Sequence, residues 1–165
     1  MAKKTLTVTL HMSELIYNVL NTTFLTGRSR NNGNNHEEVA NMQANEDEEN
    51  INQIVRSIGN AFSTLKTKLS EYISSDGTSA NNVLIDESTN LSLTLLMPSN
   101  YNQATADSIA SAAHQYLVNI AIGDWFTITN KNDAAAYMAL AASNLQEIRE
   151  AINKRVRPQR DNVTP

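Results

Sequence analysis

The chain has 165 residues, of which 18% are charged, and its net charge is −4. This length suffices for one domain with a buried core, and the negative charge argues against a protein that coats nucleic acid. The absence of cysteine excludes disulfides, thiolate metal sites and cysteine nucleophiles. The N-terminal residues lack the apolar run of a signal peptide, and no apolar stretch approaches the ~20 residues that span a bilayer, so we expect neither a signal peptide nor membrane contact.

The N-terminal part of the chain predicts a strand, a helix and a loop. Residues 5–10 alternate threonine with aliphatic residues, which is typical of a strand with one buried face. Ser13 then precedes apolar residues at helical spacing. The polar residues 27–35 predict a loop, with Arg28 and Arg30 at its start. This pattern indicates either a solvated loop or a loop that docks onto an acidic partner.

An acidic segment follows, because residues 36–50 hold six acids and no lysine or arginine. The last four of these acids are Glu46, Asp47, Glu48 and Glu49. Acids in a first turn are favoured by the helix dipole, and Asn45 is a suitable cap, so the pattern predicts that a long helix begins near Asn45. The alternative is an acidic surface that repels DNA or receives a basic neighbour.

The middle of the chain predicts this long helix and then two strands. Apolar residues recur every three or four positions over residues 51–73, close to ideal helical spacing. Residues 83–85 and 91–96 indicate two strands joined by a hairpin. Residues 5–13 and 90–99 share the order of an alternating strand, a methionine and a serine. We therefore expect these two strands to join one small sheet.

Two amphipathic helices are predicted between residues 105 and 156, with residues 124–130 as the join. Asn130 is expected to cap the second helix. Trp125 and Phe126 lie in the predicted join, where they are expected to fill the corner between the helices. The alternative is that these rings stack on a nucleic-acid base or contact a partner.

The last helix is dense in alanine. Its alanines are Ala134, Ala135, Ala136, Ala139, Ala141 and Ala142. A surface helix of a monomeric protein normally has one charged face. We therefore expect this helix to be covered on two sides, within its own fold or by a neighbouring subunit, which favours oligomerisation.

The end of the chain is basic. Arg155 suits the C-terminus of a helix, where the dipole favours cations. Arg157 and Arg160 lie beyond the predicted helix, so they indicate a tail that pairs with acids or phosphates. We expect a single domain over residues 1–156 and an extended basic tail over residues 157–165.

No catalytic motif accompanies these elements. His11, His36 and His114 lack the spacing of a metal pair, and the chain has no G-x-S-x-G, phosphate-loop or dinucleotide motif. We therefore predict no catalytic, cofactor-binding or metal-binding residues and no enzyme activity. The predicted fold class is mainly α, a bundle of four to five helices with a small antiparallel sheet formed by the N-terminal strand plus the hairpin.

A small helical domain with an acidic patch, an intervening hairpin and a basic C-terminal tail resembles the head-to-tail connector proteins (neck or adaptor proteins) of tailed bacteriophages. Residues 116–160, with Asp124-Trp125-Phe126 and Arg155-Val156-Arg157-Pro158-Gln159-Arg160, are also similar to phage proteins from gut Bacteroidetes. The resemblance implies a structural virion protein that forms a homo-oligomeric ring, commonly twelvefold. Such a ring joins the portal protein to the tail and continues the DNA channel.

The resemblance also implies sites and partners. It assigns contact with an acidic portal surface to Arg155, Arg157 and Arg160. It places residues 46–49 toward the channel, through which double-stranded DNA passes without specific binding. Arg28 and Arg30, or the hairpin around Glu87, would contact adjacent subunits or the next ring or tail protein. The implied location is the virion neck, and the host cytoplasm during assembly.

Two other functions stay open on the residues alone. One is another virion component, such as a tail completion or capsid-associated protein. The other is a soluble helical module that binds a protein. A closed ring in solution would favour the neck protein, whereas a stable monomer that binds a ligand would favour the module.

Overall fold

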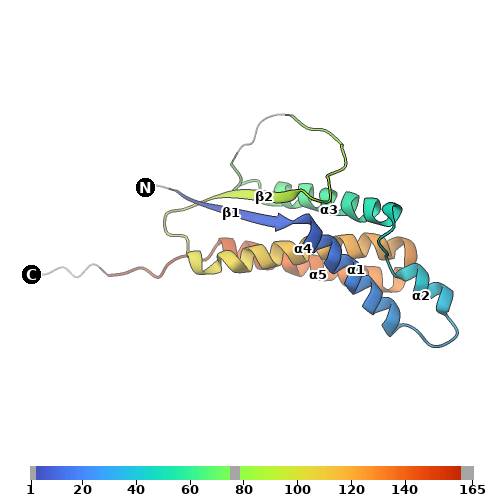
Figure 1. Cartoon of the computed structure of the whole chain (residues 1–165). Coiled ribbons are helices and arrows are strands. Elements are labelled where there is room, and N and C mark those ends of the chain that lie inside the picture. The colour runs from blue at the N-terminus through green and yellow to red at the C-terminus, as the bar shows by residue number, and fades with distance from the viewer. Residues whose placement is uncertain (1–2, 75–78, 161–165) are drawn as a thin grey trace, which may run out of the picture.

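The computed structural model describes residues 3–74 and 79–160 of the chain. Within these ranges the chain forms five α-helices, one short 3-10 helix and two strands. In chain order they are β1 (Lys4–His11), α1 (Met12–Ser29), α2 (His36–Met42), α3 (Glu48–Lys68), β2 (Asn90–Met97), the 3-10 helix (Gln103–Thr105), α4 (Ala106–Thr129) and α5 (Lys131–Ile152). The predicted class, a mainly helical bundle with a small antiparallel sheet, is confirmed (Figure 1).

Helix α4 lies at the centre of the bundle, where it packs along α5 and also contacts α1, α2, α3 and β1. Its fully buried residues Leu117 and Ile122 belong to one continuous core that also contains Ile148 of α5. At Gly123 the two helices approach so closely that an added Cβ atom would lie 2.7 Å from Cε of Met138. Burial of each large aliphatic side chain in such a core contributes about 1.5–3 kcal/mol.

The sheet consists of β1 and β2, which pair antiparallel from Lys4 opposite Met97 to His11 opposite Asn90. On β1 the burial alternates, so that Val8 is buried and the threonines on either side of it are exposed. This alternation is the strand pattern that the sequence predicted. The expectation that these two segments share one small sheet is confirmed.

The predicted hairpin is wrong. Residues 83–85 form no strand, and Val83 is 73% exposed. One edge of β2 is taken by β1, and the other edge is taken by the chain that follows α3. There the amide of Leu96 donates to the carbonyl of Tyr72, and the amide of Ser74 donates to the carbonyl of Thr94. Because both edges of β2 are occupied, no edge is left for residues 83–85 to pair with.

The boundaries of α3 differ from the prediction at both ends. The helix begins at Glu48, with Asp47 at the N-cap. Asn45 precedes the N-cap and does not cap the helix. Its side-chain oxygen accepts hydrogen bonds from the Asp47 amide and from the side chain of Asn50 in the first turn of α3. The helix ends at Lys68 rather than near Ile73, since the later residues pair with β2.

The join between the last two helices is also shorter than predicted. Helix α4 continues through Trp125 and Phe126 to Thr129, and only Asn130 separates it from α5. Two threonines in this stretch donate to carbonyls four residues earlier, Thr127 to Gly123 and Thr129 to Trp125. These bonds let polar, β-branched residues stay helical. Asn130 occupies the N-cap, but its side chain donates to the Asp133 carboxylate instead of accepting a backbone bond.

The predicted end of α5 near Val156 is four residues too late, because the helix ends at Ile152. The following residues turn back along the segment before α4. The carbonyl of Lys154 accepts from the Asn102 amide, and the amide of Val156 donates to the Asn100 carbonyl. The C-terminal segment therefore leaves the bundle at the same end as the start of β1, whose Lys4 donates to the Tyr101 carbonyl (Figure 1).

Candidate interaction surfaces

The alanine-rich helix α5 has two different faces. Its inward residues Ala134, Ala141 and Ile148 are buried in the core shared with α4. We call the opposite side the outer alanine face, which consists of the exposed residues Ala135, Ala136, Ala139, Leu140 and Ala142. Residues 134–146 include no charged residue. The expected cover on two sides is therefore present on one side only within the single chain.

The predicted tail residues are not equivalent. The Arg155 guanidinium donates to the carbonyl of Ile152 at 2.8 Å and to that of Lys154 at 3.2 Å, so it closes the end of α5. Such a cation is also stabilised by the negative end of the helix dipole. Arg157 and Arg160 are exposed and lie outside any helix or strand. Of the predicted tail, residues 161–165 lie outside the described part of the chain.

The predicted docking loop begins later than expected, because α1 extends to Ser29. Arg28 is exposed in the last turn of α1. Arg30 binds an acid of its own chain, since its Nε and Nη2 atoms donate to the two carboxylate oxygens of Asp133 at 3.1 and 2.6 Å. The bond from Arg30 lowers the pKa of the Asp133 carboxyl. Arg30 is thus committed within the isolated chain, whereas Arg28 is available to a partner.

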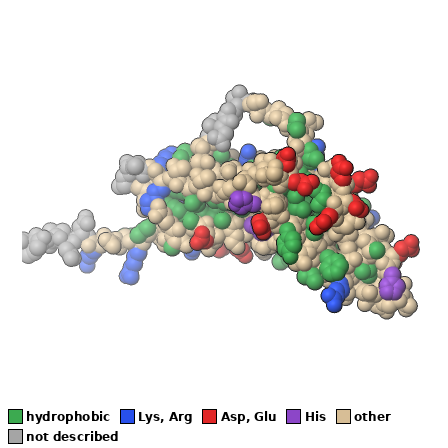
Figure 2. Space-filling view, in the orientation of Figure 1, with side chains coloured by type: hydrophobic (Ala, Val, Ile, Leu, Met, Phe, Trp, Pro, Cys, Tyr) green, Lys and Arg blue, Asp and Glu red, His purple; other side chains and the backbone are tan. Residues whose placement is uncertain are grey.

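The four predicted acids lie together at the beginning of α3, and all four are exposed. Glu46 and Asp47 precede the helix, and Glu48 and Glu49 form its first turn. The positive end of the helix dipole favours carboxylates at this position. Acidic side chains gather on this end of the face shown in Figure 2, whereas basic side chains lie along the C-terminal segment at the opposite end.

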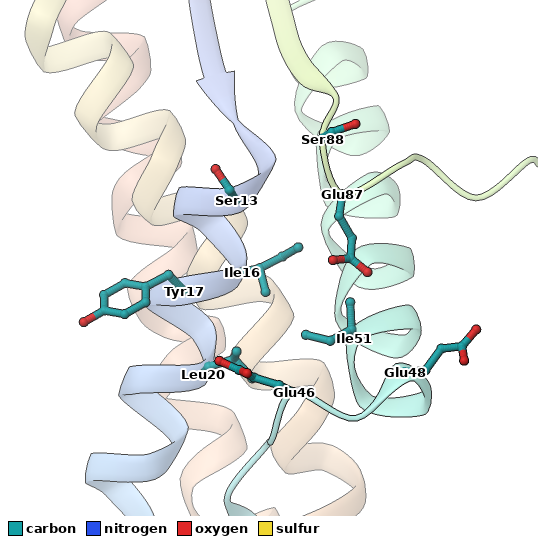
Figure 3. Close-up of a pocket in the computed structure, with 9 residues that line it drawn as sticks. All are labelled: Ser13, Ile16, Tyr17, Leu20, Glu46, Glu48, Ile51, Glu87 and Ser88. Carbon is teal, nitrogen blue, oxygen red and sulfur yellow. The ribbon is translucent and has the colours of Figure 1, made fainter.

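An open groove lies between α1 and α3 beside this acidic patch. We call it the α1–α3 groove, and its volume is about 690 Å³. It is lined by Ser13, Ile16, Tyr17, Leu20, Glu46, Glu48, Ile51, Glu87 and Ser88. Figure 3 shows Ile16 on α1 facing Ile51 on α3 across the groove, with the Glu87 carboxylate beside Ile51. The arrangement is an apolar floor with an acidic rim.

The sequence did not predict this groove, although Ser13, Glu46, Glu48 and Glu87 of its lining were each noted there. Ile16 and Ile51 follow the helical spacing of apolar residues, which predicts burial and does not show that they also line a groove. Glu87 was placed in a hairpin that does not form. No sequence signal marks the groove, because the partial exposure of Leu20 is visible only in the fold.

Trp125 and Phe126 serve different contacts inside the fold. Phe126 is fully buried, and its ring centroid lies 5.4 Å from that of Tyr137 on α5. The Trp125 indole donates to the Met42 carbonyl at 2.7 Å, which ties α4 to the end of α2. The Tyr137 hydroxyl in turn lies 2.8 Å from the Thr26 hydroxyl of α1. Both rings therefore join helices of the same chain.

Burial shifts the pKa values of His114 and Asp124, which are both on α4. Burial lowers the pKa of His114, whose Nε2 lies 3.0 Å from the Asn18 side-chain amide. Burial raises the pKa of Asp124, and a hydrogen bond with Ser57 of α3 partly offsets that rise. The two groups lie ten residues apart on α4. Within the described ranges, no group of three or more histidines and acids is arranged to hold a metal ion.

Comparison with known proteins finds no match to a family model, to a curated protein or to a solved structure. Among the helices of the described residues, none combines the length and the apolar character needed to cross a membrane.

Proposed function

We propose that this protein is a structural subunit that works as a homo-oligomer. The observation that carries the proposal is the outer alanine face, which one copy of the chain leaves uncovered. Exposed helix faces of free-standing proteins are normally charged or polar, whereas 13 consecutive residues of α5, 134–146, carry no charge. A second subunit packed on this face would remove its alanine and leucine side chains from water and would allow close approach of helix backbones.

The specific assembly that we propose is the ring at the neck of a tailed bacteriophage, between the portal and the tail. Its basis is the resemblance to connector proteins, together with a mainly helical fold of the expected kind. The position of two charged groups supports it, because the exposed acids at residues 46–49 gather at the start of α3, whereas the exposed Arg157 and Arg160 lie on the C-terminal segment at the opposite end. In such a ring the acids would suit a DNA channel, since like charge disfavours binding of the genome.

Negative-stain imaging of the purified chain tests the ring. Closed rings of uniform size, seen with the chain alone or on addition of a portal protein encoded beside it, would support the proposal. Single small particles under both conditions would contradict it. The position of the gene relative to portal and capsid genes tests the phage assignment independently of the oligomer.

A second candidate is a soluble helical module that binds a protein segment. The α1–α3 groove favours it, because an apolar floor with an acidic rim suits an amphipathic basic peptide. A chain that stays monomeric at high concentration and binds a basic peptide of another protein would support this function over the ring.

A further inference from the structure

We propose that the α1–α3 groove binds the C-terminal segment of a second copy of this chain. This inference rests on the proposed self-association and names the contact that would link neighbouring subunits. The occupant is residues 154–160, with the sequence Lys-Arg-Val-Arg-Pro-Gln-Arg. The contact is distinct from the outer alanine face, so the two surfaces can be tested separately.

The charges of the groove and the segment are complementary. Three carboxylates line the groove, those of Glu46, Glu48 and Glu87, and none of its described lining residues is a lysine or an arginine. The segment holds four cations and no acid among its seven residues, and of these Arg157 and Arg160 are exposed, whereas Arg155 closes the end of α5 in its own chain. Complementary charges steer association and fix the register of two surfaces. The pairing therefore predicts an interaction that weakens as salt increases.

The shape of the segment also suits the groove. Val156 is 48% exposed and lies between two arginines, so it presents an apolar side chain that matches the floor formed by Ile16 and Ile51. Pro158 fixes its own backbone dihedral and disfavours helix at the residue before it. The described end of the chain is accordingly extended beyond Val156. The segment therefore presents Val156 and Arg157 to a partner in an extended conformation.

The segment of one copy is too short to enter its own groove. The segment leaves the bundle beside Tyr101, next to the beginning of β1. The groove is lined by the first turns of α1 and α3, and these turns lie toward the other end of β1 (Figure 1). A strand as long as β1 spans about 27 Å, at ~3.4 Å for each residue. Residues 157–160 reach at most about 14 Å when fully extended. The occupant must therefore come from another copy.

This placement gives the contact a direction. Groove and segment lie at opposite ends of one subunit, so the contact joins unlike surfaces, head to tail. Contacts of this kind produce a closed ring when the rotation between subunits closes, and an open filament when it does not. The contact between groove and segment is therefore of the head-to-tail type that a ring requires.

Disulfide trapping tests the contact, and the natural chain helps because it has no cysteine. Full-length Ser88→Cys, in the groove lining, is mixed with full-length Gln159→Cys, in the segment. Neither change removes a charge. The expected result is a cross-linked dimer of one Ser88→Cys and one Gln159→Cys chain. Ser63→Cys, exposed on α3 away from the groove, is the matched control and should trap about tenfold more slowly.

Charge neutralisation provides a second readout. The triple variant Glu46→Gln, Glu48→Gln and Glu87→Gln should slow trapping about tenfold, since it removes the three carboxylates that would pair with the cations of the segment. The control triple variant Glu37→Gln, Glu38→Gln and Glu147→Gln changes the net charge equally outside the groove and should leave the rate unchanged. Equal rates for the two triple variants would overturn the inference.

Sedimentation of the same samples under reducing conditions separates the two claims. An oligomer that traps through Ser88 and Gln159 supports both the contact and self-association. An oligomer that does not trap overturns this inference and leaves the proposed function standing. A monomer that does not trap overturns both.

Discussion

Helices α4 and α5 are neighbours in sequence and form the largest helix pair in the fold, but their surroundings differ. Helix α4 contacts α1, α2, α3, α5 and β1, whereas α5 packs extensively against α4 alone. Both helices are nevertheless poor in charge over long stretches. On α4 this composition is explained by the neighbours that surround it. On α5 the same composition continues onto the outer alanine face, where the chain itself provides no cover, and that difference is the reason to expect a partner.

The largest expected effect is on the contact that the two helices share. Ile148→Ala should lower the free energy of unfolding by about 2–5 kcal/mol, because it removes a fully buried side chain and leaves a cavity. Leu140→Ala on the outer alanine face is the matched control and should change the stability of the monomer by less than about 0.5 kcal/mol. Urea denaturation of the two variants checks the difference. Equal losses would mean that the two faces of α5 are equally buried.

The next effect concerns the outer alanine face. Ala139→Glu should weaken self-association at least about tenfold, because it places a charge where a neighbouring helix would approach. The stability of the dissociated chain should be unchanged, since glutamate is a good helix former on an exposed surface. Size-exclusion chromatography over a concentration series measures the association. Ala139→Ser keeps the face uncharged and should behave as the natural chain; a variant with glutamate that associates normally would reject this face as an interface.

A smaller effect is expected at Asp124, on the covered side of α4. Burial raises its pKa, so the folded state binds its proton more tightly than the unfolded chain does. The stability contributed by this group is present at pH below about 3.8 and is lost as the pH rises through the higher pKa of the folded state. Asp124→Asn should therefore raise the thermal midpoint at pH 7 and have no such effect near pH 3.

The size of the Asp124 effect should be below about 1 kcal/mol, because the carboxyl is only partly shielded from water. Thermal unfolding at the two pH values measures it. Asp107→Asn, on the exposed first turn of the same helix, is the control for loss of one negative charge. A destabilised Asp124→Asn variant at pH 7 would show that the Ser57 bond outweighs the cost of burial.

The smallest effect is expected for Arg30→Ala, at the edge of α5. The Arg30 side chain of the ion pair with Asp133 is 55% exposed, so loss of the pair should change stability little. Its clearest sign is the pKa of Asp133, which should rise toward its ordinary value when Arg30 is absent. The lowered pKa of Asp133 stabilises the folded state at pH values above the ordinary pKa of the carboxyl, and this stabilisation is lost as the pH falls. The loss of stability caused by Arg30→Ala should therefore be smallest in acid. Carboxyl titration by NMR measures the pKa, with Arg28→Ala as the control.

The sequence was most informative where local periodicity decides structure. The alternation in β1 and the helical spacing of α3, α4 and α5 each predicted the right type of element. The sheet partner of β2 was correctly inferred from its likeness to β1. Errors arose where a distant segment competes for the same hydrogen bonds. Residues 72–74, at the predicted end of α3, form hydrogen bonds with the free edge of β2 instead. No local sequence pattern indicates this pairing.

The candidate surfaces show the same limit. The alanine content of α5 predicted a helix needing cover, but only the fold separates Ala134, which is buried, from Ala135, which is exposed. Likewise, Arg28 and Arg30 are indistinguishable by sequence, and only the position of Asp133 shows that Arg30 is already paired. The α1–α3 groove joins residues that are more than 70 positions apart, so its acidic rim and apolar floor could not be related before the fold was known.

Sedimentation equilibrium of the unmodified chain at near-physiological salt tests the need for a partner most directly. The expected mass is a constant multiple of 18.2 kDa at high concentration and falls on dilution. The series should reach roughly several hundred micromolar, so that even weak association is detected. A mass of 18.2 kDa at every concentration would contradict this expectation.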